Sequence, residues 1–140
     1  MTLLRFDTED QLKKFLGRGV LAQKEVNNIL ADRRKDPTAK MNKTELRYLQ
    51  TRIEPLIFKK DIVMWRFEAI TFKLADDLRY TPDFLVIGAP GYATIQFHEI
   101  KGGYIREDAI VKFKVARNLY PWFSWRMMQY KKGEWNEVLI

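Results

Sequence analysis

The sequence contains no cysteine and only one histidine, His98, among its 140 residues. The absence of cysteine excludes disulfides, thiolate metal sites and cysteine nucleophiles together. The sequence also lacks any run of about 20 apolar residues, which a helix needs to cross a bilayer. Asp7, Glu9 and Asp10 interrupt the start of the chain, so a secretory signal is not expected. We therefore expect a protein without a membrane span that stays in the cytoplasm.

Positive charge, by contrast, is in excess. The chain has 25 Lys and Arg against 18 Asp and Glu, which gives a net charge of +7 and a pI near 9.6. Hydrophobic residues make up 46% and aromatic residues 14%, enough for one ordinary core in a chain of this length. The charge balance favours a polyanionic partner, either nucleic acid or an anionic membrane surface.

Hydrophobic periodicity and breaker residues divide the chain into two parts. Residues 1–36 have the spacing of two short helices, which cannot bury a core alone, so we expect an N-terminal helical arm followed by one domain over residues 37–140. Helices are expected over residues 42–53, with Pro55 as the stop, and over residues 106–119. Strands or extended segments are expected over residues 62–68, 69–74, 79–87, 94–101, 122–130 and 135–140. This order predicts a mixed α/β fold, with a central β-sheet flanked by helices.

The two strands around the Gly88–Gly91 turn carry the residues with chemical potential. A short turn predicts a hairpin that brings Asp83 near Glu99, and Glu99 shares a strand face with Lys101 because they lie two apart. Two adjacent carboxylates repel each other, and Mg²⁺ with oxygen ligands resolves that conflict. The carbonyl of Ile100 is a further candidate ligand.

Lys101 beside such an ion could stabilise charge on a scissile phosphate, and the ion would lower the pKa of its water. The reaction indicated is hydrolysis of a phosphodiester by metal-bound water, without a covalent enzyme intermediate.

Tyr80-Thr81-Pro82-Asp83, followed after the turn by Phe97-His98-Glu99-Ile100-Lys101-Gly102, resembles the PD-(D/E)xK nuclease superfamily. Over Asn42 to Gln129, the chain looks like a group of small phage-encoded nucleases in that superfamily. It is more distantly similar to Holliday-junction resolvases. The resemblance implies a restriction-endonuclease-like core with a mixed central sheet, a Mg²⁺ site that Mn²⁺ can also fill, and Glu45 as a helical carboxylate contributing to that site.

The function that this resemblance implies is a DNA endonuclease of recombination, replication or repair. Within that class we favour an enzyme that cuts four-way junctions as a homodimer, because two symmetric cuts need two active sites. A nuclease for ordinary duplex, flap or single-stranded DNA is the nearest alternative. A catalytically silent DNA-binding accessory protein of recombination is a second alternative, from another class.

Three residues near the motifs have a structural as well as a catalytic interpretation. Glu45 with Asn42 fits a capping box, but its angle of about 40° from Leu49 on the helix favours a place in the site. His98 should face away from Glu99 and is expected to be a packing or surface residue rather than a general base. Glu68 is expected to be the partner of a nearby Arg, with membership of the site as the less favoured interpretation.

Basic and aromatic side chains supply the expected substrate contacts. The candidate DNA contacts are the basic residues Arg33, Arg34, Lys35, Lys40, Lys43, Lys112, Lys114 and Arg117. The alternative is that these side chains form an ordinary solvated surface. The aromatic residues Trp122, Phe123, Trp125 and Trp135 are expected to lie in the core or a dimer interface, rather than to stack on bases.

Overall fold

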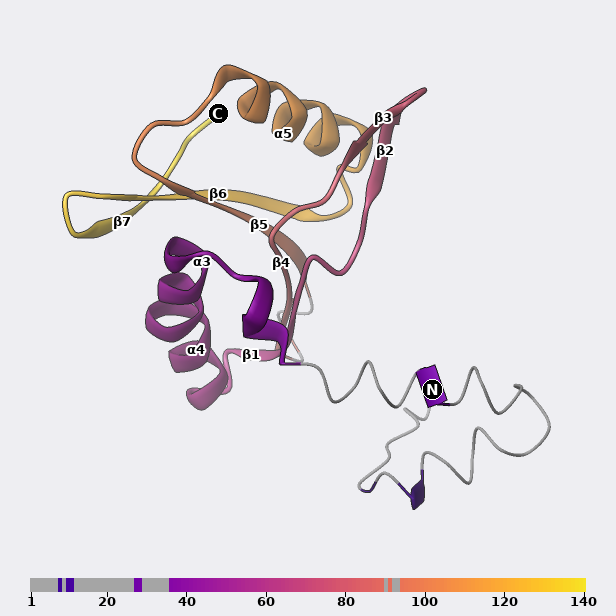
Figure 1. The fold of residues 1–140 in the computed structure, drawn as a ribbon, viewed down its shortest axis with the longest axis vertical. Helices are drawn as coiled ribbons and strands as arrows, with labels where there is room; N and C mark the ends of the chain where they lie inside the picture. Colours follow the sequence, from indigo (N-terminus) through magenta and orange to yellow (C-terminus); the bar gives the residue numbers. More distant parts are fainter. Residues whose placement is uncertain (1–7, 9, 12–26, 29–35, 90, 92–93) are drawn as a thin grey trace. The chain divides into compact units, whose positions relative to one another are not determined.

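The computed structural model describes residues 8, 10–11, 27–28, 36–89, 91 and 94–140 (Figure 1). The chain divides into two units, Met1–Asp36 and Pro37–Ile140. The basic run Arg33, Arg34 and Lys35 lies outside the described residues, as does most of the expected helical arm. The second unit is therefore described by itself. Across the described ranges, no helix is long and apolar enough to span a membrane.

The second unit is a mixed α/β fold, as the sequence predicted. Its main sheet has five strands in the order β1-β4-β5-β6-β7, in which β5 and β6 are parallel and the other neighbours antiparallel. A separate two-stranded sheet joins β2 and β3. The strands are β1 (Ile62–Phe67), β2 (Phe72–Ala75), β3 (Leu78–Tyr80), β4 (Phe84–Gly88), β5 (Ile95–Gly102), β6 (Ser124–Lys131) and β7 (Glu134–Glu137). The helical elements are η1 (Pro37–Lys40), α3 (Lys43–Tyr48), η2 (Leu49–Ile53), α4 (Glu54–Phe58) and α5 (Glu107–Leu119).

The main sheet packs on both faces, because residues alternate along each strand. Phe84 and Val86 of β4 pack with Tyr48, Leu49 and Ile53 of the helical segment that precedes the sheet. Leu85 of β4 faces the other way and packs with Phe97 of β5, Ala116 of α5 and Phe72 of β2. The helices α3 and α4 thus cover one face, and α5 with the β2–β3 hairpin covers the other (Figure 1).

The expected end at Ile53 of the helix over residues 42–53 is wrong. The helix continues through Pro55 to Phe58, and η2, a π-helical turn, stands directly before Pro55. In that turn, the Glu54 N–H donates to the Leu49 carbonyl, one residue further back than in an α-helix. Proline has no N–H and its ring clashes with the preceding turn of an α-helix, so the wider π turn accommodates it without ending the helix.

The single strand expected over residues 79–87 is also wrong. It is two strands in two sheets, β3 and β4, with Thr81, Pro82 and Asp83 between them. Pro82 cannot donate a hydrogen bond to a neighbouring strand, so the ladder cannot continue through it. The extended segment expected over residues 69–74 becomes a strand only from Phe72.

Most of the C-terminal aromatic residues lie in the core, as expected. The Trp125 ring stacks on Phe97 with centroids 5.0 Å apart, and Phe123 packs against the same cluster. Trp135 packs against Tyr48 on the other face. Trp122 is 78% exposed, so a core position is wrong for it, because it lies in the turn between α5 and β6.

Candidate active site

The candidate site lies where β4 begins, opposite the end of β5. The Gly88 N–H donates to the Thr94 carbonyl beside the turn, and hydrogen-bonded pairs alternate along an antiparallel ladder. Every second pair of β4 and β5 is therefore hydrogen-bonded, from Gly88 and Thr94 as far as Phe84 and His98. Pro82 and Ile100 would be the next such pair. Pro82 has no N–H to contribute, and the Ile100 N–H donates instead to Asp83 Oδ2 at 2.7 Å. At this break in the ladder, the Asp83 side chain replaces a strand carbonyl as the acceptor of the Ile100 N–H.

Asp83 and Glu99 form a buried pair of carboxyl groups. Phe84 pairs with His98, so the same register places Asp83 opposite Glu99, on the sheet face that α5 covers. Asp83 is 9% exposed and Glu99 is 6% exposed. Burial and then the neighbouring charge of Glu99 raise the pKa of Asp83 well above its usual range, while the Ile100 N–H lowers it. A cation between the two groups would remove the repulsion that this raised pKa reflects.

Glu99 is held by a donor at each carboxylate oxygen. Lys101 Nζ lies 2.7 Å from Oε1, and the Tyr80 hydroxyl donates to Oε2 at 2.7 Å. Burial lowers the pKa of Lys101, but Glu99, Asp83 and Glu45 together raise it above its usual value, so Lys101 stays charged. Tyr80 was not among the residues predicted to act in the site. Its only signal was its position before the Pro-Asp pair, and β3 places it over the site from a different sheet.

Glu45 caps α3 and also borders the buried pair. The Asn42 side chain accepts the Glu45 N–H at 2.9 Å, and Glu45 Oε2 accepts the Asn42 N–H at 2.8 Å, which is a complete capping box. Burial raises the pKa of Glu45, and the charges of Glu68 and Glu99 act in the same direction. Glu45 therefore lies within electrostatic reach of the site while it holds the start of the helix.

The first turn of α3 lies close to the end of β5, where the Thr44 side chain approaches the backbone of Gly102. A Cβ added at Gly102 would lie 3.0 Å from Thr44 Oγ1, tighter than an ordinary contact. Glycine at position 102 therefore lets the first turn of α3 lie directly beside the residue that follows Lys101.

The donors at this site suit a hard cation, although they do not form a closed cage. Within the described part of the chain, no group of three or more His, Cys, Asp or Glu side chains is arranged to hold a metal ion. Mg²⁺ usually takes only one or two protein carboxylates and completes its shell with water and substrate phosphate. Asp83 and Glu99 supply that number. The Ile100 carbonyl faces the same neighbouring strand as the Ile100 N–H, because both groups of a strand residue do so, and it would offer a third oxygen.

His98 is a core residue, as predicted. It is buried on the face opposite Glu99, where the Tyr48 hydroxyl lies 2.8 Å from Nδ1 and Gln96 Oε1 lies 3.0 Å from Nε2. Burial lowers the pKa of His98 to about 3, so the ring is neutral. Its position on the opposite sheet face and its low pKa both leave it unsuited to act as a general base for this site.

Glu68 borders the site through its backbone. Its N–H donates to the Asp83 carbonyl at 2.8 Å, and its φ of +47 lies in the left-handed region. Its side chain is exposed, and its charge acts on Glu45. The residue thus fixes the backbone of Asp83 from the end of β1.

The cationic residues expected to contact DNA occupy different surroundings. Lys40 and Lys43 are exposed around the start of α3, and Lys114 is exposed on α5, where Lys112 is half-buried. Arg117 donates to the Ile140 carbonyl at 2.5 Å, an interaction that ties the last residue to α5. A structural role is therefore present for Arg117, and DNA contact stays a prediction for the others.

No family model, curated protein or solved structure matches this chain.

Proposed function

We propose that the protein is a Mg²⁺-dependent DNA endonuclease, with Mn²⁺ able to replace Mg²⁺. The observation that carries the proposal is the buried pair Asp83 and Glu99 with Lys101 at 2.7 Å from Glu99. Buried like charges are costly and persist where they serve a cation or a reaction. The net charge of +7 supports a polyanionic substrate.

Each residue of the site has a role that its geometry supports. Asp83, Glu99 and the Ile100 carbonyl would hold Mg²⁺, which when bound activates water and neutralises charge on a phosphate. Lys101 donates from beside Glu99 to an oxygen of the scissile phosphate as negative charge develops there. Tyr80 fixes the second oxygen of Glu99, so that the carboxylate keeps one orientation.

Glu45 contributes a further carboxylate from α3. Its charge lies within reach of Asp83 and Glu99, on the side from which the first turn of α3 approaches β5. In this position Glu45 would accept a hydrogen bond from a water molecule in the site and orient it.

For the substrate, we propose a four-way DNA junction cut by a homodimer in the cytoplasm. This part rests on the resemblance of the Pro-Asp and Glu-x-Lys motifs to junction-resolving nucleases. A single chain supplies one site, and symmetric cutting of two strands needs two. A nuclease for duplex, flap or single-stranded DNA uses the same site and differs only in how DNA is held.

Cleavage of four labelled DNAs tests the proposal. A four-way junction, a linear duplex, a flap and a single strand are incubated with the protein and Mg²⁺ at equal concentration. Paired symmetric nicks on the junction are the expected result. Cutting confined to the other substrates would retain the nuclease and refute the junction preference.

A catalytically silent DNA-binding protein is the second candidate, supported by the positive charge alone. Mg²⁺ linkage separates it from a nuclease, because a ligand that binds only the folded state raises its stability. No shift in melting temperature at millimolar Mg²⁺ or Mn²⁺, together with DNA binding, would favour the silent protein.

A further inference from the structure

Tyr104 is an exposed aromatic residue next to the candidate site. It follows Lys101 by three residues and is 84% exposed. Consecutive Cα atoms are about 3.8 Å apart, so the Cα atoms of Tyr104 and Lys101 lie within about 11 Å of each other. That span corresponds to a few nucleotides of one strand at about 3.4 Å each. A base near the scissile phosphate would therefore come within reach of the Tyr104 ring.

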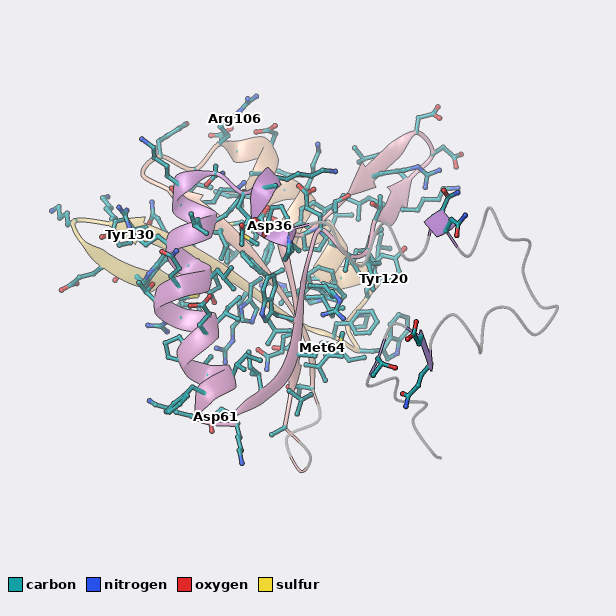
Figure 2. The ribbon with its side chains drawn as sticks, turned by 60° about the horizontal axis from the view of Figure 1, so that its bottom comes forward. Asp36, Asp61, Met64, Arg106, Tyr120 and Tyr130 are labelled. Atoms are coloured by element: carbon teal, nitrogen blue, oxygen red, sulfur yellow. The ribbon has the colours of Figure 1, made fainter. Side chains whose placement is uncertain are left out.

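The loop that carries Tyr104 is fastened to β6 at its start, through Gly103, and runs directly into α5 at its end. The Gly103 N–H donates to the Tyr130 carbonyl at 3.2 Å, and the Gln129 side chain donates to the Gly103 carbonyl. On the far side, Arg106 Nε lies 3.1 Å from Asp108 Oδ1 at the start of α5. Arg106 and Tyr130 are labelled in Figure 2. The ring is thus presented to solvent from an anchored loop, which lowers the entropy cost of binding.

Three cationic side chains flank this loop, two of them also paired with a carboxylate. Lys101 precedes it and Arg106 ends it. The first turn of α3 carries the exposed Lys43 and contacts Gly102, directly before the loop. A nucleic-acid strand at this position would therefore meet positive charge along its phosphates and an aromatic face at its bases, which is the combination that single-stranded nucleic acids require.

We propose that Tyr104 stacks on an unpaired nucleobase beside the scissile phosphate. In a continuous duplex each base is covered by its neighbours, so only an unpaired or unstacked base offers a free face. The inference rests on the proposed nuclease function and specifies its substrate class: DNA with unpaired or unstacked bases at the cut, rather than uniform duplex. Stacking on one aromatic side chain is worth about five-fold to a hundred-fold in affinity.

Binding measured in an Asp83→Asn background tests this proposal without cleavage. The probes are a single strand and a uniform duplex, each carrying 2-aminopurine, whose fluorescence falls on stacking. Tyr104→Ala should weaken binding of the single strand by at least about five-fold and abolish the fluorescence change, with duplex affinity unaltered within about two-fold. Tyr104→Trp should restore both signals. Phe58→Ala is the matched control, since Phe58 is 88% exposed at the end of α4.

Equal affinities of Tyr104→Ala and its parent for the single strand would overturn the inference, as would an equal loss on duplex. The two proposals fail separately in a parallel cleavage assay. Full-length protein that cuts no DNA refutes the nuclease. Protein that cuts, but in which Tyr104→Ala leaves the preference for unpaired DNA unchanged, refutes only the role of Tyr104.

Discussion

The carboxylate of Asp83 accepts a 2.7 Å hydrogen bond from the backbone N–H of Ile100, at the point where Pro82 interrupts the strand ladder. This contact holds Asp83 opposite Glu99. The Ile100 carbonyl faces the same neighbouring strand, β4, as the Ile100 N–H. A proline, an aspartate and a Glu-x-Lys strand thereby become one site.

Tyr80→Phe removes the hydroxyl that donates to Glu99 and retains the ring. Residues that orient a metal-binding carboxylate typically contribute about ten-fold to a hundred-fold to metal affinity or activity. We expect a loss of that size in Mg²⁺ affinity or cleavage rate, with the fold intact. Tyr120→Phe is the control, because the Tyr120 hydroxyl donates to the Lys73 carbonyl instead. Equal behaviour of the two variants would contradict a role for Tyr80.

Lys101→Met separates catalysis from metal binding. The change removes the ammonium from the scissile phosphate, and we expect cleavage to fall by at least about a hundred-fold. Stabilisation by Mg²⁺ should persist, because a competing cation beside Glu99 has been removed. Melting temperatures with and without Mg²⁺ check this, with the exposed Lys59→Met as control. Loss of the Mg²⁺ shift in Lys101→Met would show that Lys101 holds the site together.

Glu45→Gln distinguishes the two roles of Glu45. Glutamine can still accept the Asn42 N–H, so the free energy of unfolding should change by less than about 1 kcal/mol. Cleavage should fall by at least about ten-fold, since the negative charge is lost. Asn42→Ala is the converse variant, expected to cost about 1 kcal/mol of stability while leaving the cleavage rate of folded protein unchanged. Unchanged cleavage in Glu45→Gln would make Glu45 a helix cap only.

His98 gives the fold a defined pH dependence. Burial, followed by the charges of Arg126 and Arg52, lowers its pKa to about 3, whereas an unfolded histidine titrates near about 6.5. The unfolded state therefore binds the proton first. The stability from neutral His98 is complete above about pH 6.5 and is lost as the pH falls toward 3.

Chemical denaturation at pH 7 and pH 4.5 measures this effect. Wild-type protein should lose about 2–3 kcal/mol more of its unfolding free energy than His98→Gln over that interval. Glutamine is chosen because it can still pair with the Tyr48 hydroxyl. Carboxyl groups titrate in both proteins, so the difference between them isolates His98, and parallel losses would contradict the assignment.

The β4–β5 hairpin could be predicted from sequence because its determinants are local. Period-two alternation and a glycine-rich turn specify antiparallel pairing, and the pairing brings Asp83 close to Glu99. The mixed α/β class follows from the same kind of pattern. The alternation along β5 also predicts that His98 lies on the sheet face opposite Glu99.

The contact between Tyr80 and Glu99 could not be predicted, because it joins two sheets whose relative placement no local pattern records. The π turn before Pro55 was missed for a related reason. A proline alone indicates the end of a helix, whereas Leu56, beyond the proline, packs against the same core as Leu49 and Ile53. Trp122 was expected in the core or a dimer interface as part of an extended aromatic segment, and the pattern did not show that the turn before β6 includes it.

Mg²⁺-dependent cleavage of DNA by wild-type and Asp83→Asn protein, with Asp76→Asn as matched control, tests the central claim most directly. Asparagine keeps an acceptor for the Ile100 N–H, whereas Asp76 is exposed in the β2–β3 turn. We predict cutting by wild type and Asp76→Asn that requires Mg²⁺ or Mn²⁺, and at least about a hundred-fold slower cutting by Asp83→Asn. Equal cutting by all three proteins, or none by folded wild type with either ion, would contradict the account.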